Sequence, residues 1–200
     1  MSAATLAPPK IAPPPTAVPR RGYRFPVDDY ERMVEIGVLG PQHRVELLDG
    51  EVVEKMSIGK RHMRCVKWSN RCWMRALGDR AIVSVQNPLR LPSSMPEPDL
   101  ALLKFRADCY AERIPEPADC LLVIEIADTS AEDDLGRKAA LYAAAGIVEY
   151  WVVDLPRGIV HVHLGPQADG TWTSVEQVRT GRLAPQAFPD AALEVAELLN

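Results

Sequence analysis

Several features typical of membrane, extracellular or zinc-binding proteins are missing from this 200-residue chain. No apolar run approaches the roughly 20 residues that a bilayer-spanning helix needs. The first twenty residues hold six prolines and five alanines without a continuous apolar stretch, so we expect no signal peptide. The four cysteines show no CxxC spacing, which disfavours zinc and disulfides and favours free thiols in a reducing cytoplasm.

Strong positive charge is also absent, because the net charge is −4. This balance argues against a protein that coats nucleic acid through a generally basic surface, although a local basic surface is compatible with it. The composition, 47% hydrophobic and 25% charged, is that of an ordinary globular protein with one core. We expect residues 1–22 to form a disordered Pro/Ala-rich tail and residues 23–200 to form a single domain.

The most informative stretch runs from Leu121 to Asp154 and predicts a strand, a helix and a second strand. Residues 121–126 are almost wholly apolar, as in a strand covered on both faces, and the exception is Glu125 near the strand end. Residues 133–145 show helical spacing, with Gly146 as the stop signal, and residues 148–154 return as a strand. A unit of this length predicts a parallel pair of strands.

The rest of the chain supplies further elements. A short helix is expected within 23–37, with Asp28 as its cap, followed by a hairpin at 44–55 around Asp49-Gly50. A long helix at 60–77 precedes strands at 81–91 and 98–103 and a loop at 105–118. A second hairpin is expected at 158–164 and 171–178, and residues 191–199 form a short amphipathic segment that packs back on the body.

The helix at 60–77 carries a row of positive charge on one face, and no acidic residue lies between Lys60 and Arg75. Most charged faces are simply solvated, but such faces usually mix signs. A one-sign row in an acidic protein favours an anionic partner, of which the phosphate backbone is the commonest. His62 could also touch phosphate or could be an exposed histidine of the first turn. The candidate nucleic-acid contacts are Lys60, His62, Arg64, Lys67 and Arg71.

Lys138 borders the buried stripe of the helix at 133–145 and therefore needs a carboxylate partner or a path to water. Glu125 is one candidate partner, and Asp99, in the strand at 98–103, is another. Two carboxylates and a lysine at one end of a sheet are the components of a metal-dependent phosphodiesterase site. The alternative is a structural salt-bridge cluster, which is costly to bury and therefore often kept for function.

Four segments in order carry a resemblance to a known family: VELLDGEV at 45–52, PEPDLALL at 96–103, VIEIADTS at 123–130 and RKAALYAAAGIVEYWVVD at 137–154. They resemble the PD-(D/E)xK, restriction-endonuclease-like superfamily and, more narrowly, its Uma-two family. The resemblance extends from about Tyr23 to the C-terminus. It implies an α/β fold with a mixed central sheet flanked by helices, in the order α-β-β-β-α-β, with a helix and hairpin before it and a hairpin after it.

The resemblance also implies a site. Asp99 and Glu125, with the backbone carbonyl of Ile126, would bind Mg²⁺, with Mn²⁺ as the alternative ion, and Lys138 would orient or help deprotonate the attacking water. The sequence departs from the superfamily pattern at Ala127, where the motif has lysine, so the resemblance relies on Lys138 as a migrated lysine. Glu46 is either a third carboxylate of the metal site or a strand residue paired with Arg44.

The function predicted from these residues is a Mg²⁺-dependent endonuclease that hydrolyses phosphodiester bonds of DNA, acting in the cytoplasm as a homodimer and not at a membrane. The alternative is a nuclease-like fold that serves as a non-catalytic nucleic-acid-binding or assembly module, which Ala127 favours. A third possibility is a hydrolase of another phosphodiester. His161 and His163 could seed a zinc site, but no third ligand is evident in the sequence and a surface hairpin is the simpler reading.

Overall fold

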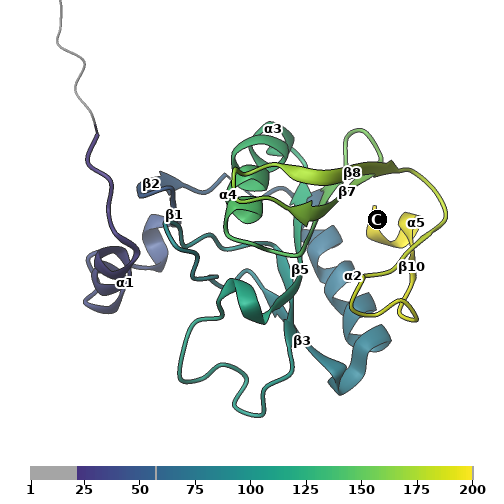
Figure 1. Ribbon diagram of the computed structural model, residues 1–200, viewed down its shortest axis with the longest axis horizontal. Helices are drawn as coiled ribbons and strands as arrows, with labels where there is room; N and C mark the ends of the chain where they lie inside the picture. The colour runs from purple at the N-terminus through teal and green to yellow at the C-terminus, as the bar shows by residue number, and fades with distance from the viewer. Residues whose placement is uncertain (1–21, 57, 200) are drawn as a thin grey trace, which may run out of the picture.

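A six-stranded mixed sheet forms the centre of the protein, with strands in the order β3-β4-β5-β6-β7-β8. The structure is a computed structural model that describes residues 22–56 and 58–199. Helices α2 and α5 cover one face of the sheet, and α3 and α4 cover the other (Figure 1). The fold is therefore the α/β architecture predicted from the sequence. The predicted disordered tail, apart from Gly22, lies outside the described residues.

The bounds of the sheet strands are β3 (Ala81–Val85), β4 (Leu100–Lys104), β5 (Cys120–Ala127), β6 (Glu149–Asp154), β7 (Ile159–Pro166) and β8 (Trp172–Val178). Only β5 and β6 are parallel, as the intervening helix predicts, and every other neighbouring pair in this sheet is antiparallel. The second predicted hairpin is confirmed as β7 and β8, and it extends the central sheet.

The alternation of β5 separates its two faces. Leu122, Ile124 and Ile126 pack on the α2 side, whereas Val123 and Ala127 pack on the side of α4. Glu125 therefore projects towards the α4 side, where the polar site lies.

Helix α2 (Lys60–Leu77) has the predicted bounds and ends at Gly78. Its buried face includes Val66 and Trp73, and the Trp73 ring lies 5.8 Å from that of Trp151 in β6. The C-terminal segment, β10 (Leu193–Glu194) and α5 (Val195–Leu198), packs against α2, as expected. Its Leu198 carbonyl accepts a hydrogen bond from Cys65 Sγ at 2.9 Å. Cys65 is one of four free cysteines, of which Cys109 alone is exposed.

The helix between β5 and β6 is confirmed but is not a regular α-helix. It consists of α3 (Ala131–Asp133), a π-helical turn (Asp134–Lys138) and α4 (Ala139–Ala144). Gly146, with φ of +80°, follows directly and confirms the predicted stop. A π-helical turn inside an α-helix is often found at a functional site.

The N-terminal elements form a separate small layer. Helix α1 spans Val27–Glu35, shorter than the predicted region, and its cap position is Pro26, so the prediction of Asp28 as the cap is wrong. The first hairpin is confirmed as β1 (Val45–Leu48) and β2 (Glu51–Glu54). Its turn residues, Asp49 and Gly50, both have positive φ, as a tight hairpin turn requires.

Two other sequence predictions need correction. The strand expected at 81–91 ends at Val85, because Gln86 adopts a left-handed conformation and Pro88 supplies no N–H to a ladder. His161 and His163 are not on a surface hairpin, because both side chains are buried. Two short antiparallel strands outside the sheet, β9 (Arg182–Leu183) and β10, complete the C-terminal region.

Replacing Gly50 by alanine should destabilise the protein by about 1–3 kcal/mol. The new Cβ would need a φ of +77° and would lie 2.8 Å from Arg24 Cβ and 3.2 Å from the Phe25 carbonyl oxygen. Gly181→Ala is the matched control, because it also has positive φ (+88°) but meets no atom within 4 Å. Urea unfolding of both variants separates the cost of the positive φ from the cost of the close contact with Arg24. An equal loss of unfolding free energy in the two variants would contradict a role for the Arg24 contact.

Candidate active site

A cleft of about 830 Å³ lies where the N-terminal hairpin, the central sheet and the helical crossover meet. Acidic side chains from four parts of the chain line it. Glu46 comes from β1, Asp99 directly precedes β4, Glu125 lies in β5, and Asp134 opens the π-helical turn. The cleft also contains Lys138 and His62, so the structure brings together all four predicted catalytic residues with one of the predicted nucleic-acid contacts, and Asp134, which was not predicted, joins them.

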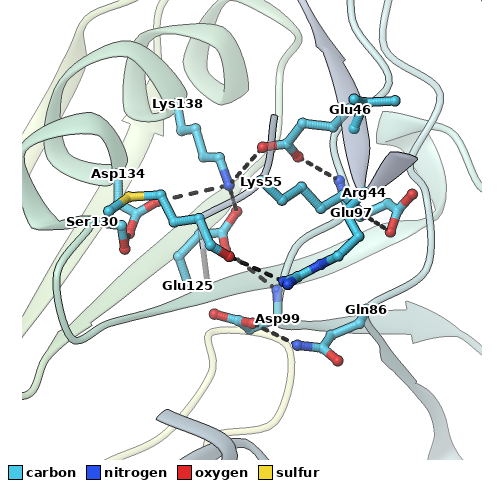
Figure 2. Close-up of polar contacts among 12 residues, drawn as sticks. Arg44, Glu46, Lys55, Gln86, Glu97, Asp99, Glu125, Ser130, Asp134 and Lys138 are labelled. Atoms are coloured by element: carbon cyan, nitrogen blue, oxygen red, sulfur yellow. Dashed lines mark hydrogen bonds and ion pairs between the residues drawn. The ribbon is translucent and has the colours of Figure 1, made fainter. Parts of the chain in front are cut away.

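Lys138 lies at the centre of a group of carboxylates (Figure 2). Its Nζ is 3.1 Å from Glu125 Oε1, 3.4 Å from Glu46 Oε1 and 3.7 Å from Asp134 Oδ1. All four side chains are buried. We call these four residues the Lys138 cluster. Of the two partners predicted for Lys138, Glu125 is confirmed, whereas Asp99 binds His62 instead.

The electrostatics of the cluster keep Lys138 charged. Burial alone would lower the pKa of Lys138, but the negative charges of Glu125, Glu46 and Asp134 outweigh burial and raise it well above its ordinary range. An ammonium group that holds its proton this firmly can orient an anion or a water molecule, but it is a poor proton acceptor.

Glu125 is held by contacts to both of its oxygens. Oε1 accepts hydrogen bonds from Lys138 Nζ and from the Tyr142 hydroxyl at 3.0 Å, and Oε2 accepts the Asp99 backbone N–H at 3.3 Å. Burial raises the pKa of Glu125 well above its usual range, Lys138 lowers it, and the neighbouring carboxylates raise it further. Glu125 therefore holds its proton more firmly than an ordinary glutamate, and a cation bound beside it would favour its ionised form.

Asp99 is placed opposite Glu125 by the strand register, because Leu100 pairs with Ile124. Asp99 Oδ2 accepts the Ile126 backbone N–H at 2.9 Å and lies 2.8 Å from His62 Nε2, and its Oδ1 accepts Gln86 Nε2 at 3.2 Å. These contacts orient the carboxylate towards the same cleft as Glu125.

His62 is not the exposed histidine of a first helical turn, and that reading of the sequence is wrong. Its side chain is largely buried, and its Nε2 lies 2.8 Å from Asp99 Oδ2. Burial would lower the pKa of His62, but the hydrogen bond to Asp99 and the charge of Asp99 raise it above the ordinary 6.5. When protonated, His62 offsets the negative charge of Asp99.

Glu46 does not pair with Arg44, which was one of its two predicted roles. Its Oε1 faces Lys138, and its Oε2 accepts the Glu97 backbone N–H at 3.0 Å. The Arg44 guanidinium instead donates to the Met56 carbonyl at 3.2 Å. The side chain of Glu46 therefore belongs to the cleft.

Asp134 was not predicted as a site residue, because its place in the first helical turn suggested only a favourable interaction with the helix dipole. Its side chain is buried, and Ser130 Oγ donates a hydrogen bond to its Oδ2 at 2.5 Å. A signal was present in the sequence: Ser130, Asp134, Lys138 and Tyr142 recur every four residues and so share one helix face. Tyr142 and Gln86 were also not predicted as site residues. Their polar groups bind Glu125 and Asp99, which are distant from them in the sequence.

The predicted nucleic-acid contacts fall into two places. His62 lines the cleft, whereas the remaining four lie on the outer face of α2, which is turned away from the sheet: Lys60, Arg64, Lys67 and Arg71. The positively charged side chains of α2 and the carboxylates of the cleft therefore lie on separate surfaces.

His161 and His163 lie on one face of β7, as predicted from their spacing, but within the buried sheet. Burial lowers the pKa of both imidazoles. His163 Nδ1 is 3.2 Å from the Tyr150 carbonyl, and its ring packs between Tyr150 and Trp172. This environment is that of core side chains.

The carboxylates of the cleft suit a hard divalent cation. Within residues 22–56 and 58–199, no three His, Cys, Asp or Glu side chains form a ready-made metal cluster. Mg²⁺, however, is typically bound by one or two carboxylates, with water and substrate phosphate completing its shell. Asp99 and Glu125 supply such a pair, linked by the hydrogen bond from the Asp99 N–H to Glu125.

Comparison with solved structures identifies the class of fold. The crystal structure of a putative nuclease belonging to DUF820 from Anabaena variabilis ATCC 29413 is similar, with a TM-score of 0.71 and 12% sequence identity. The match covers 88% of this chain and 97% of that chain. This likeness establishes a nuclease-like fold.

The family model for Uma2, described as a putative restriction endonuclease, matches residues 27–196. The chain therefore belongs to the Uma2 family, which supports a nuclease-like function. Comparison with curated proteins found no match. No helix in the described ranges is long and apolar enough to cross a membrane.

Asp134 should impose a pH dependence on stability. Burial raises its pKa from 3.8 to about 6, although Lys138 and Ser130 act in the opposite direction. Because the folded state binds this proton more tightly than the unfolded chain, the free energy of unfolding should fall as pH rises from about 4 to about 6, by roughly 1.4 kcal/mol per unit from this group alone.

Asp134→Asn should remove that contribution, so the stability difference between variant and wild type should change across this window and level off above it. Denaturant unfolding at a series of pH values measures the difference. Asp133→Asn is the control, because it makes the same change at an exposed neighbouring residue. Parallel profiles for Asp134→Asn and wild type would contradict the prediction.

Proposed function

We propose that the protein is a metal-dependent endonuclease that hydrolyses phosphodiester bonds of DNA in the cleft around Lys138. The observation that carries the proposal is the contact between a buried ammonium group and Glu125, whose second oxygen accepts the backbone N–H of Asp99. These three residues come from three elements and meet in one cleft that is large enough to admit part of a substrate.

Asp99 and Glu125, with the backbone carbonyl of Ile126, would hold Mg²⁺ or Mn²⁺. The bound ion would supply positive charge at the phosphoryl oxygens and make a water molecule more acidic. Support for this role comes from the grouping of carboxyl groups in the cleft: burial raises the pKa of Glu125 well above its usual range, and the charges of Asp134, Asp99 and Glu46 raise it further. A divalent cation offsets such a charge, whereas a purely structural cluster leaves it in place.

Lys138 would act as a cation and not as the proton acceptor. Its firmly held proton lets Nζ donate a hydrogen bond to the attacking water or to a phosphoryl oxygen and offset the negative charge that develops there. This refines the role inferred from the sequence, in which Lys138 could also deprotonate the water. Glu46 and Asp134 would position Nζ, because they contact it from opposite sides of Glu125 (Figure 2).

The oligomeric state, the cellular compartment and the type of nucleic acid also belong to the proposed function. Cleavage of both DNA strands would be served by two copies of the cleft, so we propose a homodimer, which light scattering can test. The free cysteines suit a reducing compartment, so we place the protein in the cytoplasm. We propose DNA as the substrate. The rate of cleavage of RNA of the same sequence should therefore be lower than that of DNA.

The test is nicking of supercoiled plasmid by the purified protein with Mg²⁺ or Mn²⁺. Glu125→Gln and Lys138→Met should each lower the cleavage rate by at least about 100-fold, because each removes a group that stabilises charge at the phosphoryl centre. Isothermal titration with Mn²⁺ should show binding that Asp99→Asn weakens.

Glu149→Gln is the matched control for these variants. Glu149 is a buried glutamate of β6 that accepts hydrogen bonds from Trp151 and the Gln186 backbone, and it is not among the residues that line the cleft. It should keep its cleavage rate even if it loses stability. Cleavage that survives Glu125→Gln and Lys138→Met would contradict the site, and plasmid binding without cleavage by the wild type would favour the non-catalytic binding module.

A further inference from the structure

A second, shallower groove lies on the outer face of α2, and nothing in the proposed chemistry uses it. Its volume is about 400 Å³, and its lining combines four cationic side chains with two large apolar ones: Lys60, Met63, Arg64, Lys67, Trp68 and Arg71. In the described chain, these six residues are not among those that line the cleft. The groove is therefore a separate surface.

The apolar part of this groove is unusually exposed. Trp68 is 38% exposed and Met63 is 41% exposed, whereas Trp73 and Trp151 are completely buried. The Arg71 guanidinium lies over the Trp68 ring, 5.8 Å from its centroid. An indole that stays at the surface beside cations offers one flat apolar face and adjacent positive charge.

Among the described residues, three of the four cations of the groove form no ion pair. No acidic residue lies between Lys60 and Arg75 in the sequence, and no ion pair joins Lys60, Lys67 or Arg71 to a carboxylate in the part of the chain that the structure describes. From Lys60 to Arg71 the helix rises about 16 Å, at about 1.5 Å per residue. This length matches a few nucleotides of an extended strand.

We propose that this groove binds an unpaired segment of the nucleic-acid substrate, with a base stacked on Trp68 and phosphates on the flanking cations. The proposal rests on the proposed function, because it assumes that nucleic acid is the substrate. Binding of single strands typically combines a positively charged groove with aromatic side chains on which bases stack. Bases within a duplex are already stacked and paired, and each would have to be extruded at a cost to reach Trp68.

The occupant is a nucleic-acid strand because the groove complements both parts of a nucleotide. The cations complement phosphate, and the indole and the Met63 thioether complement an apolar base face. The chain as a whole is acidic, with a net charge of −4, so this groove is a local exception to the charge of the protein. A segment bound here would lie outside the cleft and would hold the strand while a neighbouring phosphodiester enters the cleft.

The test measures the affinity of the full-length protein for a fluorescently labelled oligothymidylate by anisotropy, without divalent metal. Trp68→Ala should weaken binding about tenfold or more, because base–aromatic stacking is lost. Trp68→Phe should retain most of the affinity. Lys67→Gln should weaken binding and reduce the slope of log affinity against log salt by about 0.7, as expected for one lost phosphate contact to a single strand.

Met74→Ala is the matched control, since Met74 is an apolar side chain of the same helix, 53% exposed, and does not line the groove. It should bind oligothymidylate as the wild type does. Trp68→Ala should also leave the affinity for a blunt-ended duplex of two complementary strands unchanged. Equal losses on duplex and single strand would overturn the preference for unpaired bases.

The outcomes also separate this inference from the proposed endonuclease. If Trp68→Ala binds oligothymidylate normally while plasmid cleavage still depends on Glu125, the groove proposal is wrong and the cleft stands. If no variant cleaves plasmid but Trp68→Ala loses oligothymidylate binding, the endonuclease proposal fails and the groove stands. A change in oligomeric state with Trp68→Ala, and none in oligothymidylate binding, would assign the groove to a second copy of the chain and overturn the proposal.

Discussion

The contact of one buried lysine with three buried carboxylates is the interaction on which the rest of the site depends. Lys138 comes from the helical crossover, Glu125 from the central sheet and Glu46 from the N-terminal hairpin, so one ammonium group links three elements that are distant in sequence. Removing one partner of such a buried cluster typically costs about 3–5 kcal/mol, because the remaining charges lose their compensation. The same interaction therefore fixes the position of the hairpin and closes one wall of the cleft.

The Lys138 cluster does not balance its own charge, and this imbalance distinguishes it from a structural salt bridge. Three carboxyl groups face one ammonium group, and burial raises the pKa of Asp134 to about 6, so this carboxyl loses its proton only as pH approaches neutral. A core that needed only stability would gain more from apolar residues of similar volume. Excess carboxylates in an accessible cleft instead provide a site for a cation, which is the role proposed here for Asp99 and Glu125.

The sequence predicted regular elements well and polar contacts only in part. The long helix α2, both hairpins and the parallel pair β5–β6 follow from local periodicity and turn residues, which the tertiary structure did not override. The environment of His62 and of the buried His161–His163 pair could not be predicted, because each depends on a strand or helix distant in sequence. Asp134 had a local signal, the four-residue spacing to Lys138, but its burial arises from packing of the π-helical turn against the sheet.

The separation of charge across the molecule has a consequence for how a substrate could bind. The two basic side chains nearest to the predicted metal ligands, Lys138 and His62, contact carboxylates inside the cleft, so they contribute little net attraction for an approaching polyanion. An acidic cleft alone would repel nucleic acid. Lys60, Lys67 and Arg71, which form no ion pair among the described residues, lie on the outer face of α2 in a groove that also exposes Trp68. Affinity for a nucleic-acid strand would therefore come from the groove on α2 and not from the cleft in which the strand is cleaved. The cleft would accept a phosphodiester once a cation offsets the negative charge of its carboxylates.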